Sequence, residues 1–394
     1  MNTPDILRLE DSFQIPTYAK YPIALERGEG IYVWDTDGNR YLDFYGGHCV
    51  TLLGHCPPRV VEAVQAQAAT LMFYSNVVYS PVRARAAALL ASMAPEGLRH
   101  VFFCNSGTEA NETALKLART WTRKPGVIAT EGGFHGRTLG SLAVTWNPKY
   151  RQPYAAVLPE TTFVPFGDAD AVARVLAGRN DIGAVILEPI QSMAGVTEAP
   201  PAYFEELRRL CDRHGVALIF DEVQTGVGRT GTFSIAEQLG VRPDLITLAK
   251  SLGSGVPVGA VLVADAIAAT VQPGDQGTTF GGGMLAMAAV TATLETLRDE
   301  ALMARAEAIH ARLATALAPH VRAVRGRGCL LGLVLDGPAR PVIARLREAG
   351  ILAGGADDPN VLRLMPPLNT PDDALDTFIE TFLAVYQDEA VPGA

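Results

Sequence analysis

Residues 216–222, VALIFDE, form an apolar run that ends in two adjacent carboxylates. The run is one of a series along the chain: HVFFC (100–104), GVIAT (126–130), AVILEP (184–189), DLITLAK (244–250) and GAVLVA (259–264). Apolar residues at helical spacing fill intervals at about 108–123 and 203–214. Continuous apolar strands that alternate with helices are typical of a mostly parallel sheet covered on both faces. We therefore predict an α/β fold whose large domain is built on such a sheet.

The two ends of the chain have a different pattern. Residues 30–44, GIYVWDTDGNRYLDF, alternate apolar and polar around Asp37-Gly38, which predicts a β-hairpin. From about residue 320, short apolar runs mix with helical stretches, which indicates a smaller α+β domain. Further helices are expected at 59–70, at 82–93 and in an Ala-rich stretch at 285–318. We thus expect an N-terminal segment that contributes to the small domain, a large domain and a C-terminal small domain, with the limits 1–58, 59–305 and 306–394.

Composition limits the function classes that the chain can serve. Hydrophobic residues make up 48% of the 394 residues, which is ordinary for a globular protein with a substantial core. The net charge of −9 argues against a broad basic surface for nucleic acid. The N-terminus is polar and no run of about 18 apolar residues occurs, so we expect neither a signal peptide nor a membrane span. The odd cysteine count and the lack of a CxxC pair favour a reduced, cytoplasmic protein.

Polar residues directly follow several of the predicted strands. These clusters are Asn105-Ser106-Gly107-Thr108, Glu188, Asp221-Glu222 and Lys250. In open α/β sheets, ligands bind outside the carboxyl ends of the strands. The clusters are therefore expected to converge on one crevice.

The first cluster opens the predicted helix in CNSGTEANETALKLAR, residues 104–119. Free N–H groups and the helix dipole make such an end an anion site, to which Ser106 and Thr108 add hydroxyl donors. Gly107 would let the backbone approach the anion closely. The same residues also fit an ordinary N-cap with Glu109 in the first turn. This segment alone leaves both interpretations open.

The glycines of IFDEVQTGVGRTG match G-x-G-x-x-G after a strand, at Gly226, Gly228 and Gly231. A single match of this kind is weak support for a dinucleotide site. Asp221 and Glu222 at the strand end would repel a pyrophosphate, and the following TFSIAEQLG is a poor crossover helix. We therefore disfavour dinucleotide binding.

Lys250 in TLAKSLGSGVPVGA is, by itself, compatible with a solvated charge at a strand end. Desolvation would instead lower its pKa and make it a competent amine for imine formation. A phosphate cradle, a buried carboxylate and such a lysine together are what a pyridoxal phosphate (PLP) site requires. The combination of Ser106–Thr108, Asp221 and Lys250 therefore predicts a PLP enzyme.

The chain resembles the class III, fold-type I PLP-dependent aminotransferases, and within them the acetylornithine aminotransferase subgroup. The resemblance covers essentially the whole chain and lies in these motifs: YPIALERGEGIYVWDTDGNRYLDF, GHCPPRVVEAV, FFCNSGTEANETALKLAR, GGFHGRTLGSLAVT, EPIQ, DEVQTGVGRTG, TLAKSLGSGVPVGA, GTTFGG and VLRLMPPLN. It implies a large domain that binds the cofactor and a smaller α+β domain.

The resemblance also implies roles toward the cofactor. Lys250 would form the Schiff base and then move the proton, and Asp221 would pair with the pyridinium nitrogen. His135 would support Asp221 from behind, although it also fits a purely structural histidine. The remaining cofactor contacts would come from Ser106, Gly107 and Thr108 at the phosphate, Phe134 and Val223 on the ring faces, Gln224 at the phenolic oxygen, and Glu188.

Thr279 would reach the phosphate from a neighbouring subunit, which implies an obligate homodimer with shared active sites. Arg137 would bind the α-carboxylate of an acetylornithine-type donor. Arg363 would bind the α-carboxylate of 2-oxoglutarate or glutamate. The planar guanidinium suits both roles because it matches a carboxylate bidentately.

Two departures from the family pattern concern the substrates. Met193 in EPIQSMAG stands where a glutamate is common, and in relatives that glutamate is expected to mask the second arginine. Its loss would leave Arg363 unpaired or with another partner. His48 stands where acetylornithine aminotransferases tend to have an aliphatic residue, at a position that the resemblance implies lines the entrance to the substrate site. His48, Cys49, His55 and Cys56 match no standard zinc spacing, so no metal is expected.

The resemblance implies transamination from a terminal amine to 2-oxoglutarate, giving a semialdehyde and glutamate. N2-acetylornithine, in arginine biosynthesis, is the preferred donor. Rival donors are N-succinylornithine, succinyldiaminopimelate, carrier-bound lysine, ornithine, 4-aminobutyrate and other ω-amines. A PLP-dependent aminomutase is the rival reaction class, and a non-catalytic scaffold is disfavoured because Lys250 and Asp221 are both present.

Overall fold

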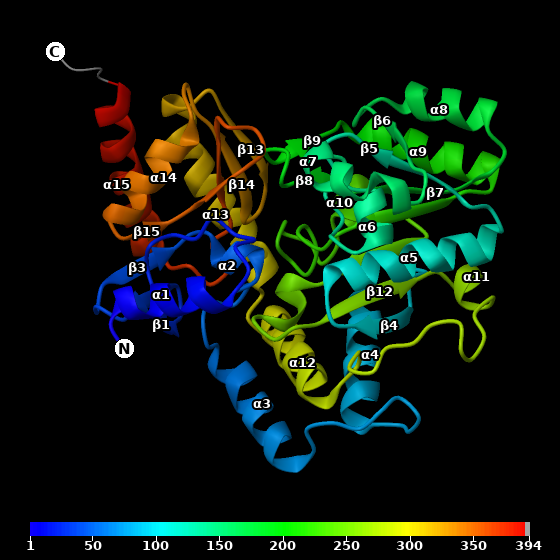
Figure 1. The fold of residues 1–394 in the computed structure, drawn as a ribbon, viewed down its shortest axis with the longest axis horizontal. Coiled ribbons are helices and arrows are strands. Elements are labelled where there is room, and N and C mark those ends of the chain that lie inside the picture. The colour runs from blue at the N-terminus through cyan, green and yellow to red at the C-terminus, as the bar shows by residue number, and fades with distance from the viewer. Residues whose placement is uncertain (391–394) are drawn as a thin grey trace.

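The central sheet of the computed structural model, which describes residues 1–390, has the strand order β4-β12-β11-β10-β7-β5-β6. Only β12 is antiparallel to its neighbours in this sheet (Figure 1). The predicted, mostly parallel sheet is confirmed, and β6 is a short strand that the sequence pattern did not predict. The strands are β4 (His100–Cys104), β5 (Gly126–Thr130), β6 (Thr162–Val164), β7 (Ile182–Leu187), β10 (Ala217–Asp221), β11 (Leu245–Leu248) and β12 (Gly259–Val263).

Helices cover both faces of this sheet (Figure 1). On β10, Ala217 and Ile219 pack in the apolar cluster that includes residues of α5 (Gly107–Thr122). Leu218 and Phe220 pack in the larger cluster on the other face, together with α9 (Pro201–His214). Every residue of β10 is buried, which is why the strand is a continuous apolar run in the sequence.

The predicted N-terminal hairpin is present and joins a sheet with the C-terminal part of the chain. This sheet has the order β1-β2-β3-β15, and Leu42 of β3 pairs in parallel with Ile351 of β15. A second four-stranded sheet has the order β13-β14-β17-β16. The N-terminal strands therefore share a sheet with β15, while the division into domains and its limits stay a prediction. The strands are β1 (Leu25–Glu29), β2 (Tyr32–Asp35), β3 (Arg40–Asp43), β13 (Ala323–Arg327), β14 (Leu330–Val334), β15 (Ile351–Leu352), β16 (Gly354–Gly355) and β17 (Val361–Leu364).

The expected long helix at 285–318 is two helices, α12 (Met284–Asp299) and α13 (Leu302–Leu317). Ala301 between them has a φ of 50°, in the left-handed region, which ends the hydrogen-bond ladder of α12. Alanine has a high helix propensity, so composition alone could not reveal this break.

The remaining helices and short strands flank or connect these sheets (Figure 1). Within residues 1–390, no helix combines the length and hydropathy that crossing a membrane requires. The elements are α1 (Thr3–Phe13), α2 (Gly46–Cys49), α3 (Pro58–Thr70), α4 (Pro81–Met93), α6 (Leu139–Ala143), α7 (Pro148–Arg151), η1 (Gln152–Val157), α8 (Ala169–Gly178), β8 (Ile190–Gln191), β9 (Thr197–Glu198), α10 (Ile235–Leu239), η2 (Lys250–Gly253), α11 (Asp265–Ala268), η3 (Ala318–His320), α14 (Ala339–Glu348) and α15 (Asp372–Ala390).

Candidate active site

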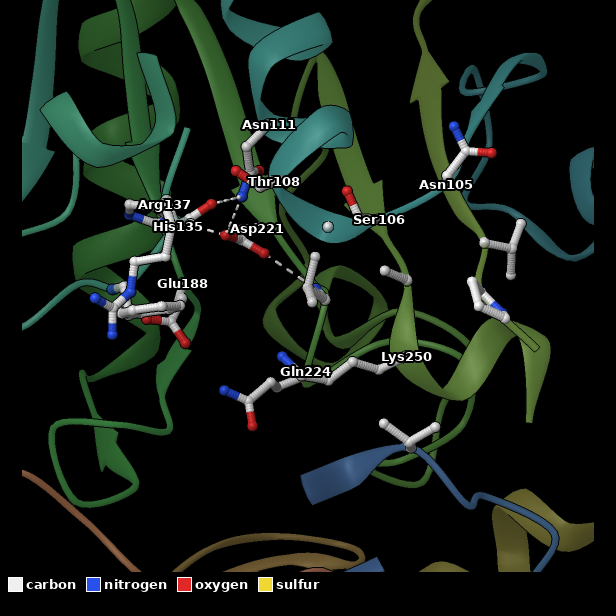
Figure 2. A pocket seen from close by; sticks show the side chains of 18 of the residues that line it. Asn105, Ser106, Thr108, Asn111, His135, Arg137, Glu188, Asp221, Gln224 and Lys250 are labelled. Carbon is white, nitrogen blue, oxygen red and sulfur yellow. Dashed lines mark hydrogen bonds and ion pairs between the residues drawn. The ribbon is translucent and has the colours of Figure 1, made fainter. Parts of the chain in front are cut away.

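A cavity of about 450 Å³ lies where β7, β10 and β11 end. Most of the side chains that the sequence selected meet in this cavity (Figure 2). Those that line it are Ser106, Gly107, Thr108, Phe134, His135, Arg137, Glu188, Asp221, Val223, Gln224 and Lys250. The expected convergence of strand-end polar groups is therefore observed.

Glu222 is the exception among these strand-end residues. It does not line the cavity, and its carboxylate accepts hydrogen bonds from Ser234 and from the backbone N–H of Ile235 at the start of α10. Burial raises the pKa of Glu222 to about 7. Its contacts therefore serve the local fold rather than the cavity.

Asp221 is a buried carboxylate at the end of β10, with hydrogen bonds to both oxygens. His135 Nδ1 and Asn111 Nδ2 each lie 2.7 Å from Oδ2, and the Val223 N–H donates to Oδ1 at 3.1 Å. Figure 2 draws the contacts of Asp221 with His135 and Asn111 as dashed lines. These partners fix the orientation of the carboxylate, which lines the cavity and can face a cationic group there.

Asn111 is a site residue that sequence reasoning missed. Its amide also donates to the His135 carbonyl at 2.7 Å and accepts from Thr247 Oγ1 at 2.8 Å. Asn111 lies one helical turn after Thr108 on α5, so it shares a face with the predicted anion cradle. That spacing was the available signal.

Lys250 follows β11 and has a φ of 44°, an unusual left-handed conformation for a residue with a long side chain. Burial lowers the pKa of its amine below the ordinary value, and Asp221 and Glu188 only partly oppose this effect. Its Nζ has no hydrogen-bond or ion-pair partner among the described residues. Lys250 thus offers a desolvated amine to the cavity, in a backbone geometry that marks functional sites.

Ser106 is the N-cap of α5, as the ordinary interpretation of the motif predicts. Its hydroxyl donates to Glu109 Oε2 at 3.0 Å, and the Glu109 N–H lies 3.3 Å from Ser106 Oγ. The N–H groups of Gly107 and Thr108 remain at the start of a long helix and line the cavity. This end of α5 therefore has the donor set of an anion site.

Beside this anion site, Val223 and Phe134 provide apolar lining to the cavity. A Cβ on Gly107 would come within 2.9 Å of the Val223 side chain, so glycine at this position lets Val223 pack directly against the start of α5. Phe134 also lines the cavity, and its N–H donates to Glu188 Oε1 at 2.9 Å. Burial and the nearby Asp221 raise the pKa of Glu188. An apolar slot between an anion site, a carboxylate and an amine fits the size and polarity of PLP.

A second cavity of about 620 Å³ adjoins the first, because both are lined by Phe134, Arg137, Gln224 and Lys250. Its further lining residues are Thr17, Tyr18, His48, Leu139, Leu142, Tyr150, Tyr154 and Met193. The Arg137 guanidinium lies 3.6 Å from the centre of the Tyr150 ring. Within residues 1–390, no ion pair includes Arg137. A stacked cation without a carboxylate partner is well placed to bind an anionic group.

His48 lines this second cavity, and its imidazole is uncharged near neutral pH. Burial, with the nearby cations Arg363 and Lys250, lowers the pKa of His48 to about 3. Its Nδ1 is hydrogen-bonded to the Tyr45 hydroxyl. His48 therefore contributes a neutral imidazole to the cavity.

Arg363 of β17 is buried and lines neither cavity. Its Nε donates to the Gly355 carbonyl at 2.6 Å, and Nη1 donates to Ser192 Oγ at 3.0 Å. No carboxylate forms an ion pair with Arg363 within the described residues. In place of the glutamate expected in relatives, Arg363 has the Ser192 hydroxyl and the Gly355 carbonyl as its partners.

Thr279 is exposed and does not line the cavities of its own chain. The neighbouring Phe280 is also exposed, and its ring lies 5.1 Å from that of Phe73.

For the metal hypothesis, no group of three or more metal-binding side chains occurs in residues 1–390.

Comparisons with known proteins place the whole chain among aminotransferases. The family Aminotransferase class-III matches residues 14–385. An acetylornithine aminotransferase of Methanopyrus kandleri is 45% identical and aligns over 94% of this chain and 96% of its own. A solved structure of ornithine aminotransferase from Toxoplasma gondii, with partial occupancy of PLP at its active site, has a TM-score of 0.92 and 32% identity over 99% of this chain and 96% of that one. Acetylornithine aminotransferase from Elizabethkingia anophelis has a TM-score of 0.87 and 30% identity over 98% of this chain and all of that one (100%).

Proposed function

Because the chain belongs to the class III aminotransferase family, we propose that it transfers the terminal amine of an N-acylated diamino acid to 2-oxoglutarate. The foremost donor is N2-acetylornithine, and the products would be the corresponding semialdehyde and glutamate. This assignment places the enzyme in arginine biosynthesis. The convergence of Lys250, Asp221 and the end of α5 on one cavity is the observation that carries it.

PLP is the proposed cofactor, and the residues present fit it. The N–H groups at the start of α5 would hold its phosphate, and the slot between Val223 and Phe134 would hold its ring. Asp221 would keep the ring nitrogen protonated, with its own geometry fixed by His135. When bound, PLP supplies an electron sink for the pair left at the donor carbon when a proton departs.

Lys250 would act twice in this reaction. Its desolvated amine would hold the aldehyde of the cofactor in the resting enzyme. Its Nζ would also be placed to hold and move the proton at the donor carbon, since Lys250 lines both cavities.

The two arginines suit two carboxylic acids. Arg137 would bind the α-carboxylate of the acylated donor, which leaves the terminal amine of the donor directed toward Lys250. The second cavity, with Tyr150 and His48, would accommodate the acyl group. Arg363 would bind a carboxylate of 2-oxoglutarate after the dicarboxylate displaces a present partner of the guanidinium, such as Ser192.

A homodimer with shared active sites is proposed as the working assembly. Exposed apolar side chains gather in one segment, Leu71, Met72, Phe73, Tyr74, Val77, Val78 and Tyr79. This segment contacts the loop of Thr279, through the rings of Phe73 and Phe280. A large exposed apolar surface favours burial against a second copy. Thr279 would then reach the phosphate of the partner's cofactor, and Thr279→Ala should weaken cofactor binding without changing the dimer.

The proposed compartment is the cytoplasm. The five cysteines form no disulfide, which suits a reducing environment.

The test of the proposed function is a panel of half-reactions. PLP-loaded enzyme is mixed with N2-acetylornithine, N-succinylornithine, ornithine, 4-aminobutyrate or glutamate, and the loss of cofactor absorbance is followed. Acetylornithine should react fastest among the ω-amines. If ornithine or 4-aminobutyrate reacts as fast, the proposed donor is wrong. If no donor discharges the cofactor's absorbance, transamination itself is wrong.

A further inference from the structure

The side chain of Ser192 connects two residues with different proposed partners. Ser192 directly follows β8, and its hydroxyl lies 3.0 Å from Arg363 Nη1 and 3.1 Å from Gln224 Oε1. All three side chains are buried. Arg363 is assigned to a substrate carboxylate, whereas Gln224 lines both cavities next to Lys250.

The direction of these hydrogen bonds is set by Arg363. A guanidinium has donors only, so the Ser192 oxygen accepts from it. The single hydroxyl proton of Ser192 is then donated to Gln224 Oε1. The Nε2 group of Gln224 is consequently left to face the cavity as a donor. Without this link the two ends of the amide have a similar shape and could exchange places.

We propose that Ser192 is a positioning residue that orients the Gln224 amide toward the cofactor and couples it to Arg363. The proposal rests on the proposed function, because it assigns an anionic ring oxygen to the neighbourhood of Gln224. An N–H donor stabilises such an oxygen and so lowers the pH at which the bound cofactor loses its proton. A carboxylate that binds Arg363 competes with Ser192 for Nη1. Binding of a carboxylate at Arg363 therefore changes the hydrogen bond between Ser192 and Gln224.

The experiment measures the pH midpoint of the visible absorbance change of the PLP-loaded enzyme. Ser192→Ala should raise this midpoint by about half a pH unit to one unit, because one ordinary hydrogen bond no longer orients the donor. Gln224→Ala should raise it at least as much. In the double variant the two shifts should not add, since both remove the same interaction. Ser192→Thr keeps the hydroxyl and should restore the midpoint toward the wild-type value.

Glutarate provides a second measurement, because it is a dicarboxylate without a keto group and cannot accept the amine. It should shift the midpoint of the wild-type enzyme more than that of Ser192→Ala. Ser80→Ala is the matched control, since Ser80 is buried but lines neither cavity. The control should match the wild-type enzyme in both measurements.

An unchanged midpoint in Ser192→Ala, or additive shifts in the double variant, would overturn the positioning role. An equal response to glutarate in Ser192→Ala and wild type would overturn the coupling to Arg363. These outcomes differ from failure of the proposed function, in which the wild-type protein itself develops no cofactor absorbance.

Discussion

The Asn111 side-chain amide donates a 2.7 Å hydrogen bond to Asp221 Oδ2, and both side chains are almost completely buried. The same amide nitrogen holds the His135 carbonyl, so one residue fixes two parts of the Asp221 surroundings. An ionised carboxylate that must face a ring nitrogen gains both charge stabilisation and orientation from such a donor. In the proposed reaction, Asn111 would therefore help to hold Asp221 in place.

Asn111→Ala should lower kcat by about 10- to 100-fold, the usual effect of losing a hydrogen bond to a charged group. Thr247→Val is the graded control, because Thr247 contacts Asn111 Oδ1 at 2.8 Å and Asp221 only at 3.4 Å. Steady-state kinetics should show a smaller loss for Thr247→Val. Equal losses in the two variants would argue against a direct role of the Asn111 donor.

Lys250 should react as a neutral amine well below the pH that an exposed lysine requires. Burial lowers its pKa from 10.5, so the neutral fraction rises at moderate pH. The rate of PLP uptake by the apoprotein, followed by absorbance against pH, should have a midpoint below that value. A midpoint at the ordinary value would show that the amine is solvated.

Lys250→Ala should abolish the absorbance band and reduce turnover by about 10²- to 10⁴-fold, the usual range for a lost general acid–base group.

Arg137→Ala should raise KM for the N-acylated donor by about 10- to 100-fold, through the loss of a charge-assisted pair. The glutamate half-reaction should change little. Tyr150→Ala should produce a weaker version of this effect, because it removes the ring over which Arg137 stacks. Tyr150→Phe keeps that ring and is the control. If Phe and Ala variants behave alike, the stacking contact has no role in donor binding.

Met193→Glu should shift the enzyme toward ω-amino donors relative to glutamate. Met193 lines the second cavity and directly follows Ser192, whose hydroxyl contacts Arg363. A new carboxylate there would compete with the carboxylate of glutamate for Arg363. KM for glutamate and 2-oxoglutarate should rise by about 10-fold, which is the usual effect of weakening one hydrogen bond to a charged group. Met193→Gln is the neutral control, and an unchanged ratio of half-reaction rates would rule out the masking idea.

His48→Asn should make the protein less sensitive to acid. The pKa of His48 is lowered to about 3 in the folded state, against an ordinary value of 6.5, so folding favours the neutral ring. This contribution is present above pH 6.5 and is lost as the pH falls toward 3. Asparagine suits the left-handed φ of 68° at this position. Urea midpoints at pH 7 and pH 5 should therefore differ less for the variant than for the wild type.

The sequence predicted β5, β7, β10, β11 and β12 well because every residue of each strand is buried, which gives a nearly continuous apolar run. It missed β6 and α8, since a strand as short as Thr162–Val164 has too few residues for a pattern. It also joined α12 to α13, because Ala301 has no sequence signature of a helix end.

At the site, the sequence located groups that follow strands but not the contacts between them. Nothing in the order of residues indicated that Arg363 is held by Ser192, since 171 positions separate the pair. Ser106 is a further example, because an N-cap and an anion ligand have the same residue preference. The geometry shows the cap, while the neighbouring N–H groups remain at the cavity.

The pairing of β3 with β15 has a consequence for how the chain is made. Leu42 leaves the ribosome long before its parallel neighbour Ile351 is synthesised. The hairpin of β2 and β3 must therefore wait with one edge open while the central sheet is assembled. Contacts so distant in sequence are slow to form. Truncation of the last strands would thus leave an unpaired edge at the opposite end of the chain, where it can capture another molecule.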